Sequence, residues 1–467
     1  MAIDLRLDPS EVALFTDLYE LTVSAAFFDH GFNEMASFEV AMRRMPAGRG
    51  FMIAAGVERL IEALEEYHFD AAAIGHLESL KLFKPEFLDY LSSLRFSGSV
   101  RALPEGTIYF AGEPILDIRA PLIEAQLLET LVLNQTGFAS TVATKAARCF
   151  AVAGGRRLVD FGPRRAQGTD ASLIAARSSY LAGFHGTANV LARKRYGIPV
   201  FGTMSHSFVM AHEHERDAFA DFAASFPTLS TMLVDTYDTI RGVENAAAVG
   251  AKLRDAGVKI HGVRLDSGDL YDLSRKARRT LDQAGFADVS ILASGNLDEY
   301  KIAELVDAGA PIDAFGVGTA LALSDDAPAG DFTYKLVDYR DRGRLKTSAG
   351  KISIPGRKQL FRAFAPNGSF YADLVGIADE GATTVAREFK PSPARTVQLL
   401  ELMVENGQRI LPRPTLAEAR ERVMNGLTAL DARYKMLRRP AEFPVRHTAA
   451  LSALVISEKL RVQKRQD

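Results

Sequence analysis

Cysteine is almost absent from the sequence: Cys149 is the single cysteine in 467 residues. One cysteine excludes an internal disulfide framework and any zinc or iron–sulfur site built from several thiolates. Such low cysteine usage is typical of proteins in a reducing compartment. We therefore expect a cytoplasmic protein.

Long apolar runs and an excess of charge of one sign are also missing. No apolar stretch approaches the roughly 20 residues needed to span a bilayer, and acidic residues interrupt the N-terminal MAIDLRLDPSE, unlike a secretory signal. The sequence has 56 Lys and Arg against 58 Asp and Glu, so no global field favours nucleic acid or an anionic membrane. We expect neither as a partner, and any phosphate site must be local.

The composition, 47% hydrophobic and 24% charged, provides a large core and room for two or three domains. Residues 1–150 mix helical periodicity, as in 51–67, with strand-like runs, as in 106–121, which predicts an N-terminal α/β domain. After Pro355 the alternation ends, and 416–439 has the pattern of a charged helix. We expect residues 356–467 to form a mainly helical segment that packs on the other domains.

Residues 151–355 contain short Val- and Ile-rich runs, each followed by a turn and an amphipathic segment, which is the pattern of repeated βα units. The predicted strands are 157–161, 198–204, 231–235, 260–266, 289–294 and 312–317. The predicted helices are 171–184, 217–226, 243–256, 270–284 and 299–308, several of them closed by a glycine, at Gly257, Gly285 and Gly309.

Polar residues collect where these predicted strands end, including Asp160, Asp235 and Asp266. In a closed parallel barrel all carboxyl ends of the strands share one rim, where the active sites of barrel enzymes lie. The sequence therefore favours an α/β fold with an irregular TIM-like barrel as its central domain. A doubly wound open sheet is the alternative, and it would also place ligands at the carboxyl ends.

Two glycine-bearing turns follow consecutive predicted strands: Ser294-Gly295-Asn296, and Gly316 to Thr319 with Gly318 between them. Glycines let backbone N–H groups approach an anion, and helix N-termini add a favourable dipole. The alternative is that these glycines only make tight turns. Two such turns in succession favour a phosphate site, as on the last two strands of a barrel.

Arg264 and Asp266 stand two residues apart on one predicted strand, so both side chains project from the same face. A cation and an acid at a strand end suit a charged substrate together with a metal or ribose hydroxyl. The alternative is a buried ion pair that ties strands together.

Three of the nine histidines lie in residues 202–215. His212 and His214 are two apart and cannot share a helical face, so we predict no protein metal site there. His206 follows a predicted strand end and is better placed for nucleophilic or acid–base chemistry.

Residues 159–168, VDFGPRRAQG, place an aromatic ring before a proline-stiffened turn that carries two arginines. Phe161 can stack on a flat heterocycle while Arg164 binds a carboxylate or phosphate. The alternatives are that Phe161 belongs to the core and that the arginines are solvated. Tyr19, in TDLYELT, is most simply a helix residue whose hydroxyl is exposed to solvent.

Seven of these stretches, in order along the chain, resemble the nicotinate phosphoribosyltransferase family. They are TDLYELT, DFGPRRAQG, the segment at 183–190, IPVFGTMSHSFV, VRLDSGDL, SGNLDEY and FGVGT. The resemblance runs from about residue 15 to beyond residue 360 and implies an enzyme of NAD salvage that works as a homodimer. Members condense nicotinate with phosphoribosyl pyrophosphate to nicotinate mononucleotide and pyrophosphate, with Mg²⁺ on the pyrophosphate and with ATP hydrolysis coupled through a phosphorylated histidine.

The resemblance also implies roles for particular residues. His206 would be the phosphohistidine, Thr203 and Arg264 would lie near nicotinate, and Asp266 would face the ribose or the ring nitrogen. Phe161 and Tyr19 of the partner subunit would sandwich the pyridine, with Arg164 helping to hold substrate. The ribose 5-phosphate would be held by Ser294, Gly295, Asn296, Gly316, Gly318 and Thr319.

One position departs from the family pattern, which usually reads GTSN where this chain has Gly186-Thr187-Ala188-Asn189. A hydroxyl near the pyridine substituent is missing, but so is the acid that nicotinamide-using relatives carry there. Nicotinate stays the expected substrate. The alternatives are another pyridine phosphoribosyltransferase that uses quinolinate or nicotinamide, a metal-dependent barrel hydrolase, and a non-catalytic structural protein.

Overall fold

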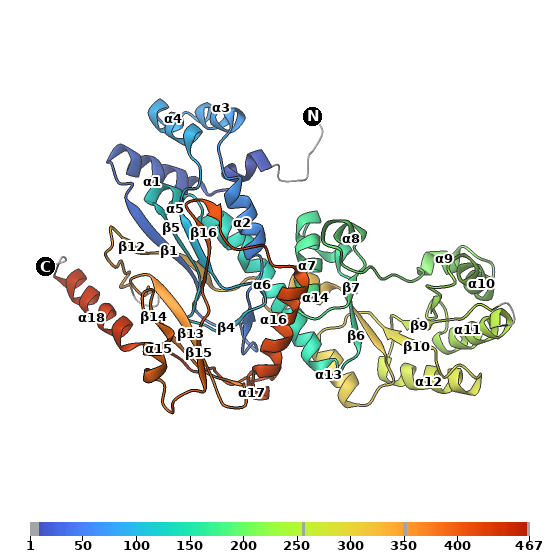
Figure 1. Ribbon diagram of the computed structural model, residues 1–467. Helices are drawn as coiled ribbons and strands as arrows, with labels where there is room; N and C mark the ends of the chain where they lie inside the picture. The colour runs from blue at the N-terminus through green and yellow to red at the C-terminus, as the bar shows by residue number, and fades with distance from the viewer. Residues whose placement is uncertain (1–8, 255–256, 349–352, 465–467) are drawn as a thin grey trace. The chain divides into compact units, whose positions relative to one another are not determined.

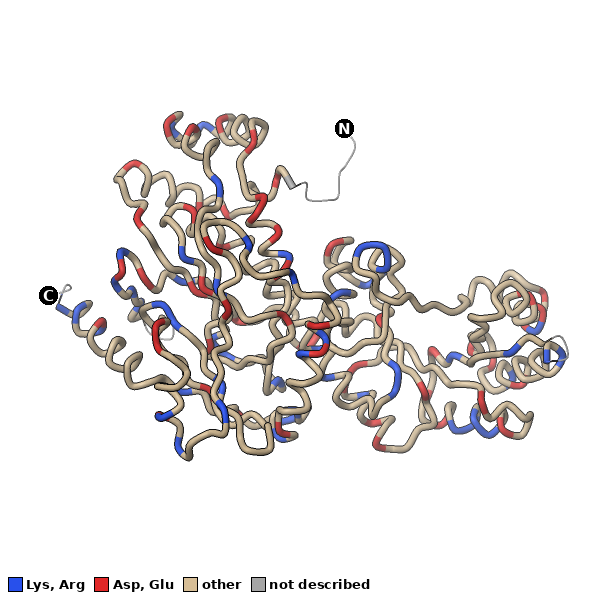
Figure 2. Tube along the Cα trace, viewed as in Figure 1, with Lys and Arg blue, Asp and Glu red and all other residues tan. Residues whose placement is uncertain are grey.

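The computed structural model describes residues 9–254, 257–348 and 353–464, which form two compact units (Figure 1). The first unit comprises residues 1–144 and 327–467, and the second comprises residues 145–326. Among the described residues, no helix is long and apolar enough to cross a membrane. Acidic and basic residues are interspersed along both units (Figure 2).

The first unit is built on a six-stranded antiparallel sheet in the order β12-β1-β5-β3-β16-β17, with a four-stranded sheet β15-β13-β14-β18 and the small pair β2-β4. Its elements up to the unit boundary are η1 (Pro9–Leu14), α1 (Leu18–Asp29), β1 (Met35–Met42), β2 (Met52–Ile53), α2 (Val57–Glu65), α3 (Ala71–Ser79), α4 (Pro85–Ser93), β3 (Ser99–Ala102), β4 (Ile108–Tyr109), β5 (Pro114–Pro121), α5 (Leu122–Gln126) and the start of α6 (Glu129–Val152).

The C-terminal part of the chain supplies the other strands of these sheets. Its elements are β12 (Phe332–Tyr339), β13 (Lys358–Phe364), β14 (Phe370–Ile377), α15 (Ala382–Val385), η3 (Ala386–Glu388), β15 (Arg395–Gln398), β16 (Glu401–Glu405), β17 (Gln408–Arg409), α16 (Leu416–Ala429), α17 (Ala432–Lys435), β18 (Val445–His447) and α18 (Ala449–Gln463). The expectation of a mainly helical segment at 356–467 missed six strands. Strand β12, expected within the central domain, pairs with β1 in the first unit.

Strand β13 shows why these strands escaped sequence analysis. Six of its seven residues are buried, including Lys358, Gln359 and Arg362, so it lacks the apolar–polar alternation of a half-exposed strand. Arg362 is held by the carboxylate of Asp373 and donates to the Ile108 carbonyl at 2.8 Å. Tertiary pairing, which a short window of sequence does not contain, makes these polar residues compatible with burial.

The second unit is a six-stranded parallel sheet, in the order β7-β6-β11-β10-β9-β8, flanked by helices. Its elements after α6 are β6 (Arg157–Asp160), η2 (Pro163–Arg165), α7 (Thr169–Leu181), β7 (Gly186–Thr187), α8 (Val190–Tyr196), α9 (His206–Met210), α10 (Glu215–Ser225), β8 (Thr231–Leu233), α11 (Thr239–Arg254), β9 (Gly262–Leu265), α12 (Leu270–Gln283), β10 (Ser290–Ala293), α13 (Glu299–Asp307), β11 (Ala314–Val317) and α14 (Thr319–Leu323).

The βα rhythm expected for this region is confirmed. Five predicted strands correspond to β6, β8, β9, β10 and β11, and all five predicted helices are present within a few residues. The capping glycines Gly257, Gly285 and Gly309 have φ of +76°, +80° and +69°. The predicted strand at 198–204 makes only an isolated bridge, between Val200 and Thr187. In the described sheet β7 and β8 are end strands, so backbone pairing gives an α/β parallel sheet and no ring of paired strands.

Candidate functional site

The carboxyl ends of the parallel strands bring together residues that are far apart in the sequence. Strand β6 ends at Asp160, Ser294 follows β10, and Gly316 lies near the end of β11. In the sheet Arg264 of β9 stands beside Leu292 of β10 and Leu233 of β8. All strands run the same way, so these ends share one edge, where α/β proteins bind ligands.

Arg264 is the centre of this edge. Its Nε donates to Oγ of Ser294 at 2.8 Å, one terminal nitrogen donates to Oγ1 of Thr203 at 3.1 Å, and the other donates to Oδ1 of Asp266 at 2.7 Å. The guanidinium also lies 5.2 Å from the centre of the Phe161 ring. A planar, always charged fork held at three points is a rigid anion-recognition group, and each terminal nitrogen keeps one N–H for a ligand.

Asp266 is ionised at neutral pH in this arrangement. Burial acts to raise the pKa of its carboxyl, but the Ser294 hydroxyl at 2.5 Å and the charge of Arg264 outweigh burial and lower the pKa below its usual value. The other oxygen of the carboxylate lies 3.9 Å from Nε2 of His206. A fixed negative charge therefore sits beside both the arginine and the imidazole.

His206, the first residue of α9, has a partly exposed ring that is hydrogen-bonded at Nδ1 and has two carboxylates near Nε2. Nδ1 lies 3.1 Å from Oγ1 of Thr236, and Nε2 lies 4.0 Å from Oδ1 of Asp235 as well as near Asp266. The Asp235 side chain is 1% exposed. The Thr236 hydroxyl and the two nearby carboxylates orient the imidazole, as a nucleophilic or proton-carrying histidine requires.

Asp160 supports the aromatic side of the site. Its carboxylate accepts from the Thr187 hydroxyl at 2.6 Å and from the Gly162 amide at 2.8 Å. Burial raises the pKa of Asp160 to about 6, although these two hydrogen bonds act to lower it. Its backbone carbonyl also accepts from the amide of Ala188 at 2.8 Å, which links β6 to the position where the family pattern is broken.

Phe161 is 9% exposed, and it packs tightly against the glycine of the neighbouring strand. A side chain at Gly316 would place its Cβ 2.3 Å from the Phe161 ring, so only glycine fits there. Gly316 was expected to let a phosphate approach the backbone. In this structure the Phe161 ring makes that close approach.

The two glycine turns differ in what their glycines do. Gly295 has φ of +92°, and a Cβ there would meet the Asp266 carbonyl at 2.0 Å, so the turn itself requires glycine. A Cβ at Gly318 would meet only ordinary contacts, the nearest at 3.4 Å, which leaves space beside its backbone. Asn296 adopts a left-handed φ of +49°, and Thr319 is exposed at the start of α14.

Helix dipoles contribute less than the sequence suggested. Helix α14 has five residues, and the N-terminus of α13 is capped by the Asp298 side chain, which accepts from the Lys301 amide at 2.8 Å. Phosphate binding at these turns would thus depend on backbone N–H groups of the turns more than on aligned helices.

Several predicted residues lie outside the Arg264 cluster. Arg164 is exposed in η2, and Tyr19 is on α1 of the first unit, about half exposed. His212 lies 2.8 Å from the Phe208 carbonyl and 3.3 Å from Asp221, while His214 precedes α10. The two side chains therefore have different surroundings.

A magnesium ion carried by pyrophosphate is compatible with the residues present. Among the described residues there is no group of three or more His, Cys, Asp or Glu arranged to hold a metal. Mg²⁺ usually takes only one or two protein carboxylates and completes its shell with water and substrate phosphates. Asp235 and Asp266 supply two such carboxylates, and Oδ1 of Asp235 is buried without a hydrogen-bond partner in the described chain.

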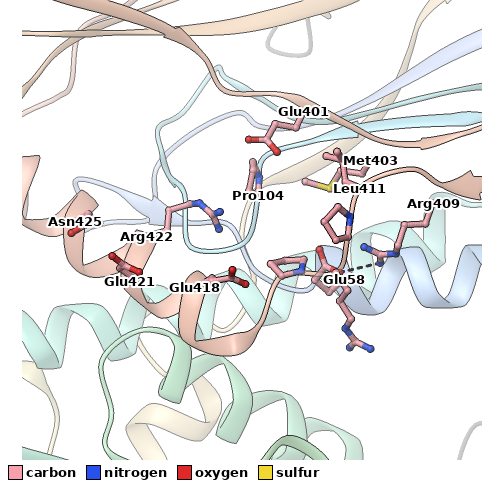
Figure 3. Close-up of a pocket in the computed structure, with 13 residues that line it drawn as sticks. Glu58, Pro104, Glu401, Met403, Arg409, Leu411, Glu418, Glu421, Arg422 and Asn425 are labelled. Atoms are coloured by element: carbon pink, nitrogen blue, oxygen red, sulfur yellow. Dashed lines mark ion pairs between the residues drawn. The ribbon is translucent and has the colours of Figure 1, made fainter.

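A cavity of about 600 Å³ in the first unit is less suited to catalysis (Figure 3). Its arginines are already paired: Arg409 lies 3.0 Å from Glu58, Arg413 contacts Glu62, and Arg422 donates to the Glu105 carbonyl. Charges satisfied in this way hold α16 and β17 in place. These paired arginines are less available to a ligand than Arg264, whose two terminal nitrogens each keep one N–H.

Comparisons with known proteins show the family of this chain. Family models for the N-terminal domain, the main family region and the C-terminal domain of nicotinate phosphoribosyltransferase match residues 14–136, 156–343 and 357–455. A nicotinate phosphoribosyltransferase of Mycobacterium tuberculosis is 45% identical over 97% of this chain and 94% of its own length. The chain belongs to the nicotinate phosphoribosyltransferase family.

Solved structures agree with membership of the nicotinate phosphoribosyltransferase family. The crystal structure of human nicotinic acid phosphoribosyltransferase is similar with a TM-score of 0.84 and 32% identity, over 95% of this chain and 99% of the human chain. A nicotinate-nucleotide pyrophosphorylase from Pyrococcus furiosus is similar with a TM-score of 0.74 and 26% identity, over 92% and 99% of the two chains.

Three residues shape the site of this family member without a site role predicted from the sequence. Thr236 holds His206, Asp235 flanks it, and Thr187 binds Asp160. Asp235 was visible as a polar strand end. The two threonines carried no signal, because an isolated hydroxyl acquires its role only from the partner that the fold places beside it.

Proposed function

We propose that the protein joins nicotinate to phosphoribosyl pyrophosphate, forming nicotinate mononucleotide and pyrophosphate in NAD salvage. Membership of the family supports the reaction. The observation that carries the assignment to this edge of the sheet is the Arg264 guanidinium, held by Ser294, Thr203 and Asp266 with two N–H groups left over.

Recognition of nicotinate follows from that fork. The pyridine carboxylate would accept from the two remaining N–H groups of Arg264, a charge-assisted geometry that a neutral amide satisfies less well. The ring would stack between Phe161 and Tyr19 of the partner subunit, and Arg164 would help to hold substrate. Ala188, which lacks a carboxylate, offers no acceptor for the amide N–H of nicotinamide.

The reaction requires the protein mainly to position the substrates and to stabilise the charges that develop. Transfer from the pyrophosphate builds positive charge on the ribose, and the ionised Asp266 would stabilise it. The pyridine nitrogen is itself a nucleophile, so no strong base is needed. The turn of Ser294, Gly295 and Asn296 and the turn of Gly318 and Thr319 would hold the ribose 5-phosphate.

Cofactors and assembly complete the proposal. Mg²⁺, when bound, neutralises charge on the leaving pyrophosphate, and Asp235 and Asp266 are the carboxylates that would hold it. ATP would phosphorylate His206, and the added charge would favour one arrangement of the surrounding loops. A homodimer in the cytoplasm is part of the same proposal, because the pyridine site would take Tyr19 from the partner.

One assay tests the proposed reaction. Purified protein is incubated with phosphoribosyl pyrophosphate, Mg²⁺ and either nicotinate, nicotinamide or quinolinate, and each mononucleotide is quantified by chromatography. We expect nicotinate mononucleotide as the main product. A faster reaction with quinolinate or nicotinamide would replace the proposed substrate, and no product from any pyridine would overturn the proposal.

A further inference from the structure

An ion-pair cluster around a buried lysine in the second unit contains groups that the proposed reaction does not use. Lys145 on α6 has a side chain that is 1% exposed, and its ammonium lies 2.7 Å from Oε2 of Glu299. The same ammonium lies 2.8 Å from Oδ1 of Asp325 and 3.1 Å from Oδ1 of Asp326. On the following turn of α6, Nε of Arg148 donates to Oε1 of Glu299 at 2.8 Å.

The partners of Lys145 connect directly to the two glycine turns. Glu299 is the first residue of α13, three residues after Asn296 of the first turn. Asp325 and Asp326 follow Ser324, the left-handed cap of α14, which begins directly after Gly318 of the second turn. One ammonium therefore fixes the start of α13 and the end of α14 to the same point on α6.

Stability alone gives a weak reason for this arrangement. Desolvating an ammonium is costly, and apolar side chains of similar volume often stabilise a core as well as a buried ion pair does. An ammonium has three N–H donors, however, and here three carboxylates surround it. Such a cluster defines the distance between two elements more sharply than apolar contacts do, because each oxygen must stay within hydrogen-bond reach.

We propose that Lys145 is a positioning residue for the ribose 5-phosphate, because it holds the 294–296 turn and the Gly318 turn at the spacing that a phosphate group requires. This inference rests on the proposed role of these turns in binding phosphoribosyl pyrophosphate. Lys145 acts through Glu299, Asp325 and Asp326, and its buried ammonium does not touch the substrate.

The test is the substitution Lys145→Met, which keeps the length of the side chain and removes the charge. We expect the KM for phosphoribosyl pyrophosphate to rise at least about tenfold, the scale of losing a group that orients a ligand-binding residue. The KM for nicotinate should rise less than the KM for phosphoribosyl pyrophosphate, since Arg264 keeps Thr203 and Asp266 and shares only Ser294 with the two turns. Lys145→Arg, which keeps the charge, should recover most of the affinity.

Lys358→Met is the matched control. Lys358 is also buried, 2% exposed, and lies 3.0 Å from Glu39, but it belongs to the first unit. Both Met variants are expected to lower the melting temperature. Only Lys145→Met should raise the KM for phosphoribosyl pyrophosphate selectively, a change that a purely structural role would not produce.

A second variant covers poor folding of Lys145→Met. Asp325→Asn combined with Asp326→Asn keeps the Lys145–Glu299 pair and loosens only the α14 side, so a smaller selective rise in the same KM is expected. Binding is also measured without turnover, as the melting-temperature increase caused by phosphoribosyl pyrophosphate with Mg²⁺. The increase in melting temperature should be smaller in Lys145→Met and in the Asp325→Asn, Asp326→Asn variant than in the wild-type protein. This test holds even if the wild-type protein proved inactive with nicotinate.

The outcomes separate the inference from the proposed function. Wild-type protein that forms no mononucleotide but is stabilised by phosphoribosyl pyrophosphate would contradict the proposed reaction alone. An unchanged KM and an unchanged thermal shift in the folded variants would overturn the role of Lys145. Equal rises in the KM values for both substrates would overturn it too, because they would indicate general distortion.

Discussion

Replacing Arg264 by alanine tests the centre of the site. The substitution removes the charge that would bind the nicotinate carboxylate, and it also removes three side-chain hydrogen bonds and leaves Asp266 with Ser294 as its remaining donor. A hydrogen bond to a charged group contributes about 1.5–3 kcal/mol. At about 1.4 kcal/mol per factor of ten, kcat/KM for nicotinate should fall by about tenfold to 10²-fold.

Arg264→Lys separates charge from geometry. A lysine keeps the positive charge but has no planar fork, so it cannot bind Ser294, Thr203, Asp266 and a carboxylate together. We expect a loss of kcat/KM close to that of the alanine variant. Initial rates over a range of nicotinate concentrations, at saturating phosphoribosyl pyrophosphate, measure both variants.

Arg278→Ala provides the comparison. Arg278 makes three hydrogen bonds of similar length, to Asp282 at 2.8 Å and to the carbonyls of Val289 and Phe286 at 2.6 Å each. It lies on α12 and binds the chain just before β10, near the amino end of that strand. Its loss should lower stability without changing kcat/KM. Normal nicotinate kinetics in Arg264→Ala, or an equal kinetic loss in Arg278→Ala, would refute the reasoning.

Three other substitutions probe neighbouring features. Gly318→Ala should leave the melting temperature nearly unchanged, because the alanine Cβ would meet only ordinary protein contacts. The same Cβ would occupy the space beside the turn, so binding of phosphoribosyl pyrophosphate should weaken. Unchanged affinity would show that this turn is purely structural. Gly295→Ala should instead lower the melting temperature, since a Cβ would lie 2.0 Å from the Asp266 carbonyl at φ +92°; unchanged melting would contradict that contact. Asp160→Asn tests how the protonation of Asp160 affects stability. The pKa of Asp160 in the folded protein, about 6, exceeds the ordinary value of 3.8, so the folded state binds more protons than the unfolded state. The protein should therefore lose stability as the pH rises from about 4 to slightly above 6. From pH 5 to 8 this loss amounts to about 1–2 kcal/mol, and denaturant unfolding should show it in wild type and not in Asp160→Asn; parallel pH profiles would exclude the raised pKa.

Much of the second unit could be predicted from the sequence because parallel strands buried on both faces appear as short apolar runs with glycine turns between them. The ends of these runs located Arg264, Asp266 and Ser294 before any contact was known. The segment at 198–204 also has an apolar run, yet it makes one bridge at Val200, because whether such a run becomes a strand depends on its neighbours.

What could not be predicted depends on distant partners. Lys358 and Arg362 made β13 resemble a surface segment, although ion pairs with Glu39 and Asp373 let them be buried. The burial of Lys145 could not be predicted either, since nothing local in the sequence indicates that three carboxylates more than 150 residues away surround it. In each case the burial of a charge is decided by tertiary pairing.

The role of His206 is tested most directly by the rate of nicotinate mononucleotide formation, with and without ATP, in the wild-type protein and in His206→Ala. The imidazole, held by Thr236 between Asp235 and Asp266, would carry the phosphoryl group that couples ATP to loop arrangement, whereas Arg264 and the turns remain in the variant. We therefore predict that wild type is stimulated by ATP and hydrolyses it, while His206→Ala forms the mononucleotide slowly, without ATP hydrolysis or stimulation. A variant that still hydrolyses ATP and responds to it would contradict the account.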